Sequence, residues 1–532
     1  MKKLPLGIQT FSKIVEGNYV YVDKTQYIYN LVNDFNCCFL SRPRRFGKSL
    51  LLDTIAEVFK GNKALFEGLW IYDSDYAFQP YPVIRLDMGG IDNETPTALK
   101  RSIAVDIKRY IKTEGFDITG KNPLDILKLL IEALSEKYNQ RVVVLIDEYD
   151  KPILDHLGSL NEAEANRNVL RGFFGVLKSM DPYLRFVMFT GVSKFTKTSV
   201  FSGLNQVTDI TMKEKYANIC GVSVDDLDQY FGDHIRNLLT LKKFQLYENL
   251  HDEILAWYDG YSWDGETRVL NPWSLLSFFD HEKFSNFWYA SGSPKFLMDL
   301  IREKPAAYTT LKNYELTEIM LDSVDIANIS IEPLLFQTGY LTVKEIIDSA
   351  SDTVYIADMP NHEVRSAFNL HTLSALTANS DAQAYHMQSD IKKALQNGDL
   401  QKTLALLRSL FASIPYELHI GREAYYHSVF YAVMNVLGFE MEAEVSVSQG
   451  RIDAMLELAD KVYILEFKYS DCEPDVSAEE KQKLFAAALK KGMEQIKAKG
   501  YSRRYAGSGK TIYQAAYAFL GRDDIEMLVE RL

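Results

Sequence analysis

The run SRPRRFGKSLL, residues 41–51, has the residue types of a loop that binds the phosphates of a nucleotide. Gly47 lets the backbone approach a phosphate, Lys48 supplies a positive charge, and Ser49 can ligate magnesium. Ser49 also opens an expected helix whose positive dipole end faces the anion. The usual pattern GxxxxGK[ST] has its first glycine where this chain has Arg42, so the spacing alone leaves the motif undecided.

The run RVVVLIDEYDKP, residues 141–152, ends its apolar stretch with two acids. At the end of a buried strand, Asp147 would join the ligand shell of magnesium and Glu148 would orient the attacking water, as phosphoryl transfer requires. An ordinary strand end or helix cap is the alternative explanation for such a pair. Two motifs in the right order, each after an expected strand, favour a site for ATP and Mg²⁺.

A third apolar run, RFVMFTGVSKF, ends in Thr190 and Ser193. Their hydroxyl groups stand where a sensor of the γ-phosphate could sit. Taken alone, Thr and Ser at such positions are more often simple turn residues. We therefore count both as candidates for the nucleotide site on the strength of the two preceding motifs.

A second group of candidates lies in GRIDAMLELADKVYILEFKYS, residues 450–470. Because side chains alternate along a strand, Glu466 and Lys468 share one face, and a turn near residues 459–461 can bring Asp453 to that face. Asp453 and Glu466 are then candidate metal ligands, with a lysine nearby, as a magnesium-dependent nuclease requires. A half-exposed hairpin has the same alternation of charged and apolar residues, so this pattern alone is weak.

The elements that must position the first group follow a regular order from about residue 35 to 211. Short apolar runs without polar alternation precede helical patterns over 48–59, 96–113 and 162–179; these runs are FNCCFL, VIRLDM and VVVLID, and RFVMFTG follows the last helix. Strands buried on both faces have this character. The order predicts an α/β domain with a mostly parallel sheet.

The rest of the chain changes pattern twice. Residues 212–345 are helical and aromatic, and we expect an all-helical lid or a winged-helix-like region there. A helix around 421–437, a strand pair over 440–468, a basic helix near 476–500 and a closing strand, KTIYQAAYAFL, predict a separate C-terminal α/β domain. The predicted domains are therefore 1–211, 212–345, a connector over 346–404, and 405–532.

The composition is that of a folded protein with the length for about three domains: 532 residues, 47% apolar and 25% charged. No stretch has the apolar length of a membrane span, and the first residues lack the apolar block of a signal peptide, so we expect a cytoplasmic protein without a membrane partner. The four cysteines lack zinc-ligand spacing, and we expect reduced thiols.

The charge distribution is uneven. The net charge of −13 disfavours indiscriminate binding of nucleic acid over the whole surface. Between Lys481 and Lys510, however, nine Lys or Arg residues stand against one acid, Glu494. This basic run is the candidate contact for a phosphate backbone.

A further sequence, GSGKT at 507–511, imitates the core of a phosphate loop. The residues after it, TIYQAAYAFL, favour a strand where a phosphate loop would need a helix. We expect no phosphate binding at this second sequence.

Several motifs together resemble the AAA-ATPase-like family of bacterial P-loop proteins, which join this module to a C-terminal PD-(D/E)XK nuclease-like domain. The motifs are RPRRFGKSLLLDTI, VVVLIDEYDKP, FTGVSKFTKTSVFSGLN, WYDGYSWDG and NPWSLL. The resemblance extends from Leu4 through the C-terminal strand. It implies a P-loop NTPase sheet, the helical or winged-helix-like middle region, and a restriction-endonuclease-like α/β domain.

The resemblance also bears on the loop. In such proteins an arginine-rich loop replaces the usual first glycine, so Arg42 does not count against an ATP site. Arg44 and Arg45 then either help to neutralise phosphate or only solvate the loop. With these two arginines, Phe46 and Leu50 complete the expected nucleotide-binding segment around Gly47, Lys48 and Ser49.

For the C-terminal domain the resemblance adds three residues. Glu423 matches the acid on the first helix of PD-(D/E)XK nucleases, and Gln495 and Tyr501 resemble the helix glutamine and tyrosine found in several branches of that superfamily. The expected catalytic residues are Glu148 in the ATPase and Glu423, Asp453, Glu466, Lys468 and Gln495 in the nuclease-like domain. Gly450, Arg451 and Ile452 stand where the superfamily's name puts a proline, which leaves cleavage open.

The sequence therefore predicts a protein that binds and hydrolyses ATP with Mg²⁺ and whose C-terminal domain binds or cleaves DNA. The alternative is a nucleotide-switched scaffold in which the nuclease-like domain serves only for docking. The oligomeric state stays open.

Overall fold

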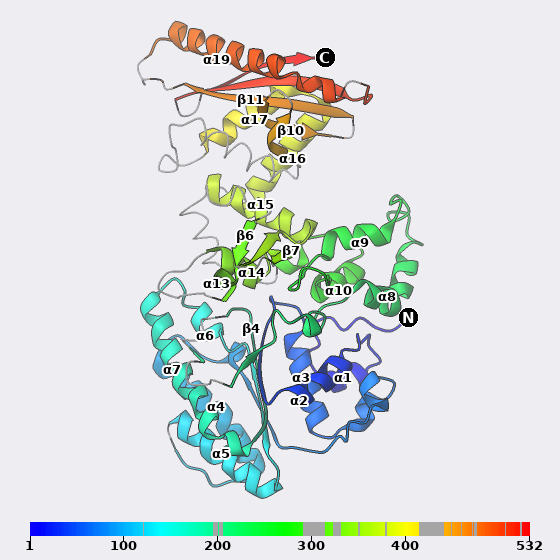
Figure 1. The fold of residues 1–532 in the computed structure, drawn as a ribbon, viewed down its shortest axis with the longest axis vertical. Helices are drawn as coiled ribbons and strands as arrows, with labels where there is room; N and C mark the ends of the chain where they lie inside the picture. The colour runs from blue at the N-terminus through cyan, green and yellow to red at the C-terminus, as the bar shows by residue number, and fades with distance from the viewer. Residues whose placement is uncertain are drawn as a thin grey trace. The chain divides into compact units, whose positions relative to one another are not determined.

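A computed structural model describes most of the chain and divides it into two compact units. The first lies within Met1–Ser293 and Lys312–Val364, and the second within Arg365–Leu532 (Figure 1). The described residues are 1–120, 122–194, 200–201, 206–290, 314–322, 331–348, 352–377, 380–413, 441–447, 450–458, 460–470, 472, 476–505, 507–521 and 524–532.

The first unit is built on a five-stranded sheet of order β2-β3-β4-β1-β5, in which every pair of neighbours is parallel. Its strands are β1 (Cys37–Ser41), β2 (Val83–Asp87), β3 (Val142–Asp147), β4 (Leu184–Gly191) and β5 (Thr208–Asp209). β1 and β3 are buried along their whole length, which explains why their sequences are unbroken apolar runs. Because the strands are parallel, all of their carboxyl ends meet at one edge of the sheet.

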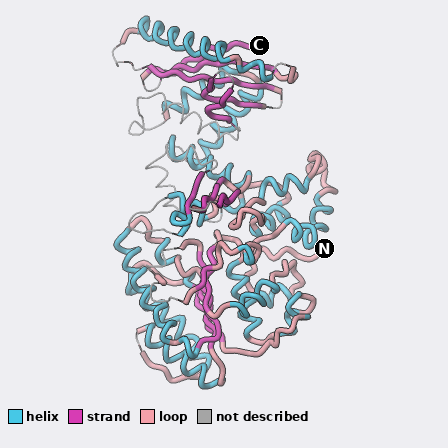
Figure 2. Tube along the Cα trace, viewed as in Figure 1, coloured by secondary structure: helices cyan, strands magenta, loops and turns pink. Residues whose placement is uncertain are grey.

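Helices cover both faces of this sheet (Figures 1 and 2). They are α1 (Phe11–Glu16), α2 (Thr25–Asp34), α3 (Lys48–Phe59), α4 (Pro96–Glu114), α5 (Pro123–Tyr138), α6 (Lys151–Leu154) and α7 (Leu160–Ser179). The sequence around residue 95 favours the start of α4. The Thr95 side chain accepts a hydrogen bond from the Ala98 N–H, and Pro96, which has no N–H, suits the first helical position because an N–H there would have no partner within the helix. The predicted strand and helix order is confirmed, and α5 is an additional helix that the sequence analysis did not identify.

The remainder of the first unit contains helices and a small sheet. The helices are α8 (Val224–Leu238), α9 (Leu250–Tyr258), α10 (Pro272–His281), α11 (Phe287–Ala290), α13 (Glu318–Asp322) and α14 (Ile331–Thr338). The strands β6 (Tyr314–Thr317), β7 (Thr342–Asp348) and β8 (Thr353–Asp358) form an antiparallel sheet of order β6-β8-β7. The all-helical alternative for residues 212–345 is therefore wrong, since β6 and most of β7 fall in that range and pair with β8.

The second unit is a mixed five-stranded sheet with helices on both faces. Its order is β13-β12-β11-β10-β9, and only β11 and β12 run parallel. The elements are α15 (His362–Thr377) from Arg365 onward, α16 (Asp381–Asn397), α17 (Leu400–Ala412), β9 (Met441–Val447), β10 (Gly450–Glu457), β11 (Lys461–Ser470), α19 (Ala478–Lys499), β12 (Thr511–Leu520) and β13 (Asp524–Arg531).

The two faces of this sheet have separate cores. Leu407 and Phe411 of α17 pack with Phe467 on one face, and Met493 and Ile496 of α19 pack with Ile464 and its neighbours on the other. The expectation that residues 346–404 form a connector differs from the structure. This segment contains part of β7, all of β8 and α16, and Leu395 of α16 belongs to the core on the α17 face. The predicted helix around 421–437 lies outside the described residues.

No helix in the described ranges combines the length and the apolar character that crossing a membrane would require.

Candidate functional site

The loop between β1 and α3 has the backbone form of a phosphate-binding loop. Two residues adopt positive φ angles, Arg45 at 68° and Gly47 at 88°, so the chain turns sharply just before α3 begins. At Gly47 a methyl group would meet no described atom within 4 Å, so the space beside the loop is open there. The amino end of α3 and the N–H groups of this turn form a site suited to an anion.

Lys48 lies on the loop itself. Its Nζ donates hydrogen bonds to Arg42 O at 2.8 Å and to Pro43 O at 2.9 Å. Burial lowers the pKa of this ammonium, while Asp147, Glu148 and Asp150 act in the opposite direction. Its ammonium therefore lies at the amino end of α3, where a phosphate bound by the loop would lie.

Asp147 is fixed by neighbours on both sides of β3. Thr190 Oγ1 donates to Asp147 Oδ1 at 2.7 Å, because β4 lies between β1 and β3. The Arg85 Nη2 atom lies 3.9 Å from Asp147 Oδ2 and 3.1 Å from Ser49 O, to which it donates. The structure thus brings Ser49, Asp147 and Thr190 to one edge of the sheet.

Glu148 follows in an uncommon conformation. Its φ is +49°, and its side chain is half-buried. Burial raises the pKa of its carboxyl, Lys48 lowers it, and Asp147 and Asp87 raise it. The carboxylate approaches Gly89 so closely that a methyl group there would lie 2.4 Å from Glu148 Oε2. Glycine at position 89 therefore provides the room that this carboxylate occupies.

Ser193 is buried in the turn after β4. Asp150 Oδ2 accepts hydrogen bonds from the N–H groups of Val192 at 2.9 Å and Ser193 at 2.6 Å. Burial raises the pKa of Asp150 to about 6 even though these bonds lower it. The Ser193 hydroxyl has no hydrogen-bond partner within the described part of the chain, so it is the less well oriented of the two sensor candidates.

The other residues of the predicted nucleotide segment range from the exposed Arg45 to the buried Phe46. Arg45 stacks on Trp273 with 4.5 Å between its guanidinium carbon and the ring centroid, and Phe46 is buried with its ring centroid 4.8 Å from that of Tyr261. Leu50 is half-buried on α3. Arg44 is half-buried, and its positive charge lowers the pKa of Glu148.

Two groups near the loop were missed from the sequence. Arg85 lies on β2, and its Nη1 pairs with Asp53 at 2.5 Å. As the one charged residue amid the apolar residues of VIRL, it was a signal that could have been noticed. Asp150 stood inside the DEYD motif, yet nothing in its spacing indicated that it would bond to the turn after β4.

The donor set at this edge suits magnesium. Mg²⁺ prefers hard oxygen ligands, and it is commonly bound by one or two protein groups together with substrate phosphates. The Ser49 hydroxyl and the Asp147 carboxylate supply such oxygens next to the phosphate loop. The residues present therefore fit the ion that the sequence predicts.

The C-terminal candidates are only partly described. Glu466 is fully buried on β11, with Lys468 Nζ 3.1 Å from its Oε1 and Lys499 Nζ 3.8 Å from its Oε2. The two residues Glu466 and Lys468 therefore share a face, as the alternation predicts. In the antiparallel ladder Ala454 of β10 pairs with Leu465 of β11. Asp453 precedes Ala454 and Glu466 follows Leu465, so the two acidic positions lie on the same side of this pair.

Other parts of the predicted nuclease set lie outside the described residues: Glu423 as a whole, and the side chains of Asp453 and Tyr501. Gln495 is half-buried on α19, one turn before Lys499. Within the described part of the chain, no group of three or more His, Cys, Asp and Glu residues is arranged to hold a metal ion.

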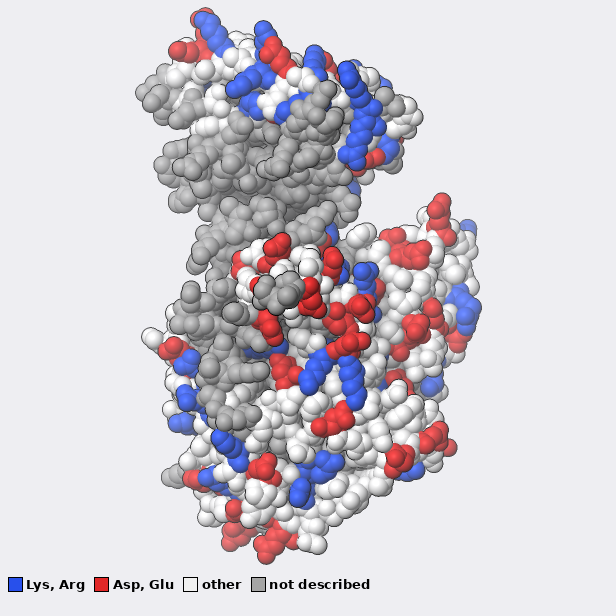
Figure 3. All heavy atoms as spheres, viewed as in Figure 1, with Lys and Arg blue, Asp and Glu red and all other residues white. Residues whose placement is uncertain are grey.

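The basic run is largely matched by acids. At least five of its nine cations form ion pairs: Lys481 with Asp524, Lys490 with Glu494, Lys497 with Glu530, Lys499 with Glu466, and Lys510 with Glu457. Figure 3 shows Lys and Arg side chains over the second unit with Asp and Glu side chains among them. The face near α19 is therefore mixed in charge, and the sequence count overstated its positive character.

The residues after GSGK form a strand, as the sequence predicts. Thr511 begins strand β12, and Lys510 Nζ bonds to Glu457 at 2.6 Å and to Leu458 O at 2.9 Å. A strand in this place offers no helix end to an anion.

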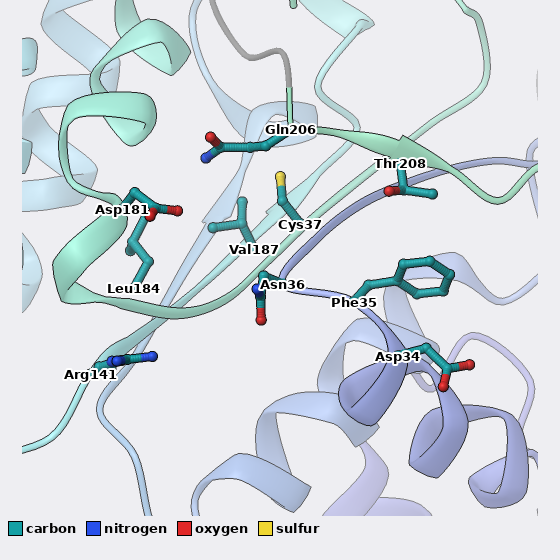
Figure 4. A pocket seen from close by; sticks show the side chains of 10 residues that line it. All are labelled: Asp34, Phe35, Asn36, Cys37, Arg141, Asp181, Leu184, Val187, Gln206 and Thr208. Carbon is teal, nitrogen blue, oxygen red and sulfur yellow. The ribbon is translucent and has the colours of Figure 1, made fainter.

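A cavity of about 280 Å³ lies at the opposite edge of the first sheet (Figure 4). Cys37 and Val187, at the amino-terminal parts of β1 and β4, line it together with Asp34, Asp181 and Arg141. None of the predicted site residues lines this cavity, so we do not connect it with the chemistry at the carboxyl edge.

Comparison with known proteins gives two family matches. Residues 5–201 match the model described as a predicted AAA-ATPase, and residues 421–527 match the model of the PD-(D/E)XK nuclease superfamily. The first match includes the loop, the acids after β3 and Thr190. The second includes Glu423, Asp453, Glu466, Lys468 and Gln495.

Individual proteins are also similar. A protein of Azotobacter chroococcum mcd 1, described as an uncharacterized protein in the vnfD 5' region, is 36% identical over 539 residues, covering 100% of this chain and 99% of that protein. The solved structure of the Aeropyrum pernix ORC2 protein in ADPNP and ADP complexes covers 68% of this chain and 98% of its own, with 12% identity and a TM-score of 0.27. That score is too low to relate the two folds.

Proposed function

Since the chain belongs to the AAA-ATPase-like family and carries a C-terminal domain of the PD-(D/E)XK nuclease superfamily, we propose that its first unit binds and hydrolyses ATP. The observation that supports this most is the contact of one Arg85 nitrogen with both Ser49 and Asp147. It places the start of the loop helix beside the acid at the end of β3, where a nucleotide's outer phosphates would lie.

Each residue has a role in this proposal. The N–H groups of the loop and Lys48 bind the phosphates, and Glu148 orients water and accepts its proton. A raised pKa suits Glu148 to this task, because a general base works best when its pKa is near the working pH. Thr190 holds the Asp147 carboxylate in place. Magnesium, held through Ser49 and Asp147, would neutralise charge on the phosphate oxygens.

The test uses the full chain with Lys48→Ala and Glu148→Gln. Lys48→Ala should abolish binding of ATP, and Glu148→Gln should keep binding while it slows hydrolysis. Lys60→Ala, which removes an exposed lysine paired with Glu57 just after α3, is the matched control and should behave as wild type. Unchanged binding and turnover in both site variants would refute the assignment.

For the second unit we propose a magnesium-dependent site that binds or cleaves nucleic acid, with DNA as the expected polymer. The buried Glu466 beside Lys468 supports it, since an acid and an ammonium on one strand face are the pair that such chemistry needs. Glu466 and Asp453 would hold the ion, and Lys468 would stabilise charge on the phosphate. Glu423 and Gln495 complete the proposed set.

A metal-dependent cleavage assay on linear, circular and single-stranded DNA tests this second proposal. Asp453→Ala and Glu466→Gln should abolish cleavage, whereas Glu530→Gln, which removes an exposed acid paired with Lys497, should not. If both site variants cleave as the wild type does, the assignment of the nuclease site is wrong.

One observation favours the scaffold alternative for the second unit. The many ion pairs of the basic run leave less positive charge for a phosphate backbone than the sequence suggests. In that case the wild type would neither cleave DNA nor bind it in a salt-dependent manner, while ATP binding by the first unit would persist.

A further inference from the structure

Arg42, which replaces the expected first glycine of the loop, is fully buried. Its Nη1 donates to Ser41 O and to Thr211 O, both at 2.9 Å, and its Nη2 donates to Tyr216 O at 3.1 Å. Its guanidinium carbon lies 3.8 Å from the centroid of the Trp263 ring. The guanidinium is thus committed to backbone carbonyls and an indole, so it is not a ligand for phosphate.

The neighbouring loop residues contact the same part of the first unit. The ring of Phe46 lies 5.6 Å from that of Trp263, and Trp288 Nε1 donates to Arg44 O at 3.1 Å. Pro43 faces Gly339, where an added methyl group would come within 2.8 Å of Pro43 Cβ. Residues 42–46 therefore contact side chains and backbone that lie 169 or more positions away in the chain.

Hydrogen bonds of the neighbouring residue Ser262 fix the backbone beside Trp263. Next to it, Ser262 N donates to Thr342 Oγ1 at 2.6 Å, and Thr342 Oγ1 donates to Ser262 O at 2.9 Å. Thr342 is the first residue of β7, so the turn that carries Trp263 is tied to the small antiparallel sheet. A ring held in this manner can fix the position of the arginine that stacks on it.

The conformation of the loop is unfavourable unless other parts of the protein stabilise it. Its phosphate-binding form includes a non-glycine residue, Arg45, at positive φ, which is an unfavourable backbone state outside glycine. Ordering a flexible loop upon binding also reduces affinity by the entropy lost. A loop held in the binding form beforehand avoids that loss.

We propose that Arg42 and Trp263 are positioning residues of the nucleotide site, whose stacked side chains hold the loop in its phosphate-binding form before a nucleotide arrives. The proposal rests on the proposed ATP binding for its effect on affinity, but its effect on the free loop does not depend on nucleotide. Arg42 thus provides through its side chain the loop order that a tight glycine turn provides elsewhere.

Arg42→Lys is the first test. Lysine keeps the positive charge but lacks the planar guanidinium, which stacks on Trp263 while it donates hydrogen bonds to backbone carbonyls. Arg185→Lys is the matched control. Arg185 also donates to a backbone carbonyl, Val32 O at 3.1 Å, and lies over Phe59, but it sits near the start of β4, away from the loop. Three quantities are measured on each full-length variant: hydrogen exchange of the amides of residues 44–49 without nucleotide, affinity for ATP with Mg²⁺, and the midpoint of thermal unfolding.

Arg42→Lys should speed exchange of the loop amides about tenfold and weaken ATP binding by a similar factor, which corresponds to about 1.4 kcal/mol. Its unfolding midpoint should fall no further than that of Arg185→Lys. Loop exchange and affinity equal to those of the control would overturn the proposal. If the wild type binds no ATP at all, the proposed function fails, and the exchange measurement alone still decides the role of Arg42.

Trp263→Phe and Trp263→Leu provide the second test. Both shorten the side chain, but only phenylalanine keeps an aromatic face for the guanidinium. We expect Trp263→Phe to keep most of the loop protection and Trp263→Leu to lose as much as Arg42→Lys, with no further loss in the double variant Arg42→Lys/Trp263→Leu. Additive losses in the double variant would show that the two residues act independently and would contradict the proposal.

Discussion

Thr190 Oγ1 donates a 2.7 Å hydrogen bond to Asp147 Oδ1, although 43 positions separate the two residues in the chain. The bond exists because β4 is inserted between β1 and β3, which puts the end of β4 beside both the phosphate loop and the acid. Both side chains are buried, so the contact is shielded from competing water. It links the sensor candidate directly to the candidate ligand of magnesium.

Removal of this donor should impair hydrolysis more than binding. Thr190→Val keeps the shape of the side chain and leaves one oxygen of a buried carboxylate with a donor fewer, which typically costs about 1–3 kcal/mol. We expect the ATPase rate to fall roughly tenfold or more, with a smaller change in ATP affinity. Steady-state kinetics of Thr190→Val, with Thr208→Val at the amino-terminal side of the sheet as control, measures this. Equal rates in the two variants would contradict it.

Gly89 and Gly90 offer a matched pair of positions for testing Glu148, the proposed catalytic glutamate. A methyl group at Gly89 would lie 2.4 Å from Glu148 Oε2, whereas at Gly90 it would meet no described atom within 4 Å. Gly89→Ala should therefore displace the Glu148 carboxylate and slow ATP hydrolysis about as much as Glu148→Gln does. Gly90→Ala should hydrolyse ATP like the wild type, and both variants should bind ATP. If Gly89→Ala hydrolyses at the wild-type rate, Glu148 is not held as the structure has it.

Asp150 predicts a dependence of stability on pH. Burial raises the pKa of its carboxyl from 3.8 to about 6 in the folded chain. Between these values the folded state binds more protons than the unfolded state, so the free energy of unfolding falls as pH rises from about 4 to 6. The decline due to this group is on the order of 3 kcal/mol, since a tenfold change in an equilibrium constant corresponds to about 1.4 kcal/mol.

Asp150→Asn should lack this decline, because the amide stays neutral and its oxygen can still accept from the N–H groups of Val192 and Ser193. Urea unfolding at pH 4, 5, 6 and 7 measures the free energy of unfolding for each variant. The difference between Asp150→Asn and wild type should grow across this range, whereas Asp155→Asn, an exposed acid paired with Lys151, should run parallel to wild type. Parallel curves for both variants would disprove the raised pKa.

Substitution of the lysine in each of the two GK sequences should affect ATP binding differently. Lys48 lies on a loop before a helix, whereas Lys510 pairs with Glu457 before a strand. Lys510→Ala should bind ATP with wild-type affinity, and Lys48→Ala should not bind it measurably. Titration of both variants with ATP and Mg²⁺ makes the comparison. A loss of ATP binding in Lys510→Ala would place a nucleotide at the second sequence and overturn this view.

The strands of the first sheet could be predicted from the sequence because they are buried on both faces. A continuous apolar run such as VVVLID identifies such a strand without knowledge of its neighbours, and the helix over 48–59 was found to the residue. The middle region was harder. Strands β6, β7 and β8 are short and mostly half-exposed, and β6 pairs with the more distant β8, so their local pattern did not separate them from helices.

The C-terminal charge was misjudged for a related reason. A count of lysines along residues 481–510 cannot include the acids of β10, β11 and β13, which reach the run only once the sheet is formed. The shared face of Glu466 and Lys468, in contrast, follows from the two-residue period of a strand and was predictable.

The sequence by itself determined the local parts of the candidate nucleotide site: the loop with Gly47 and Lys48, the acids after β3, and the order of strands and helices that brings each to a strand end. Those features depend on neighbours within a few residues. Only the tertiary structure decided the surroundings of Arg42, whose partners Thr211 and Trp263 are 169 or more positions away. No local period encodes such a contact, because it forms only when the helical region packs against the loop.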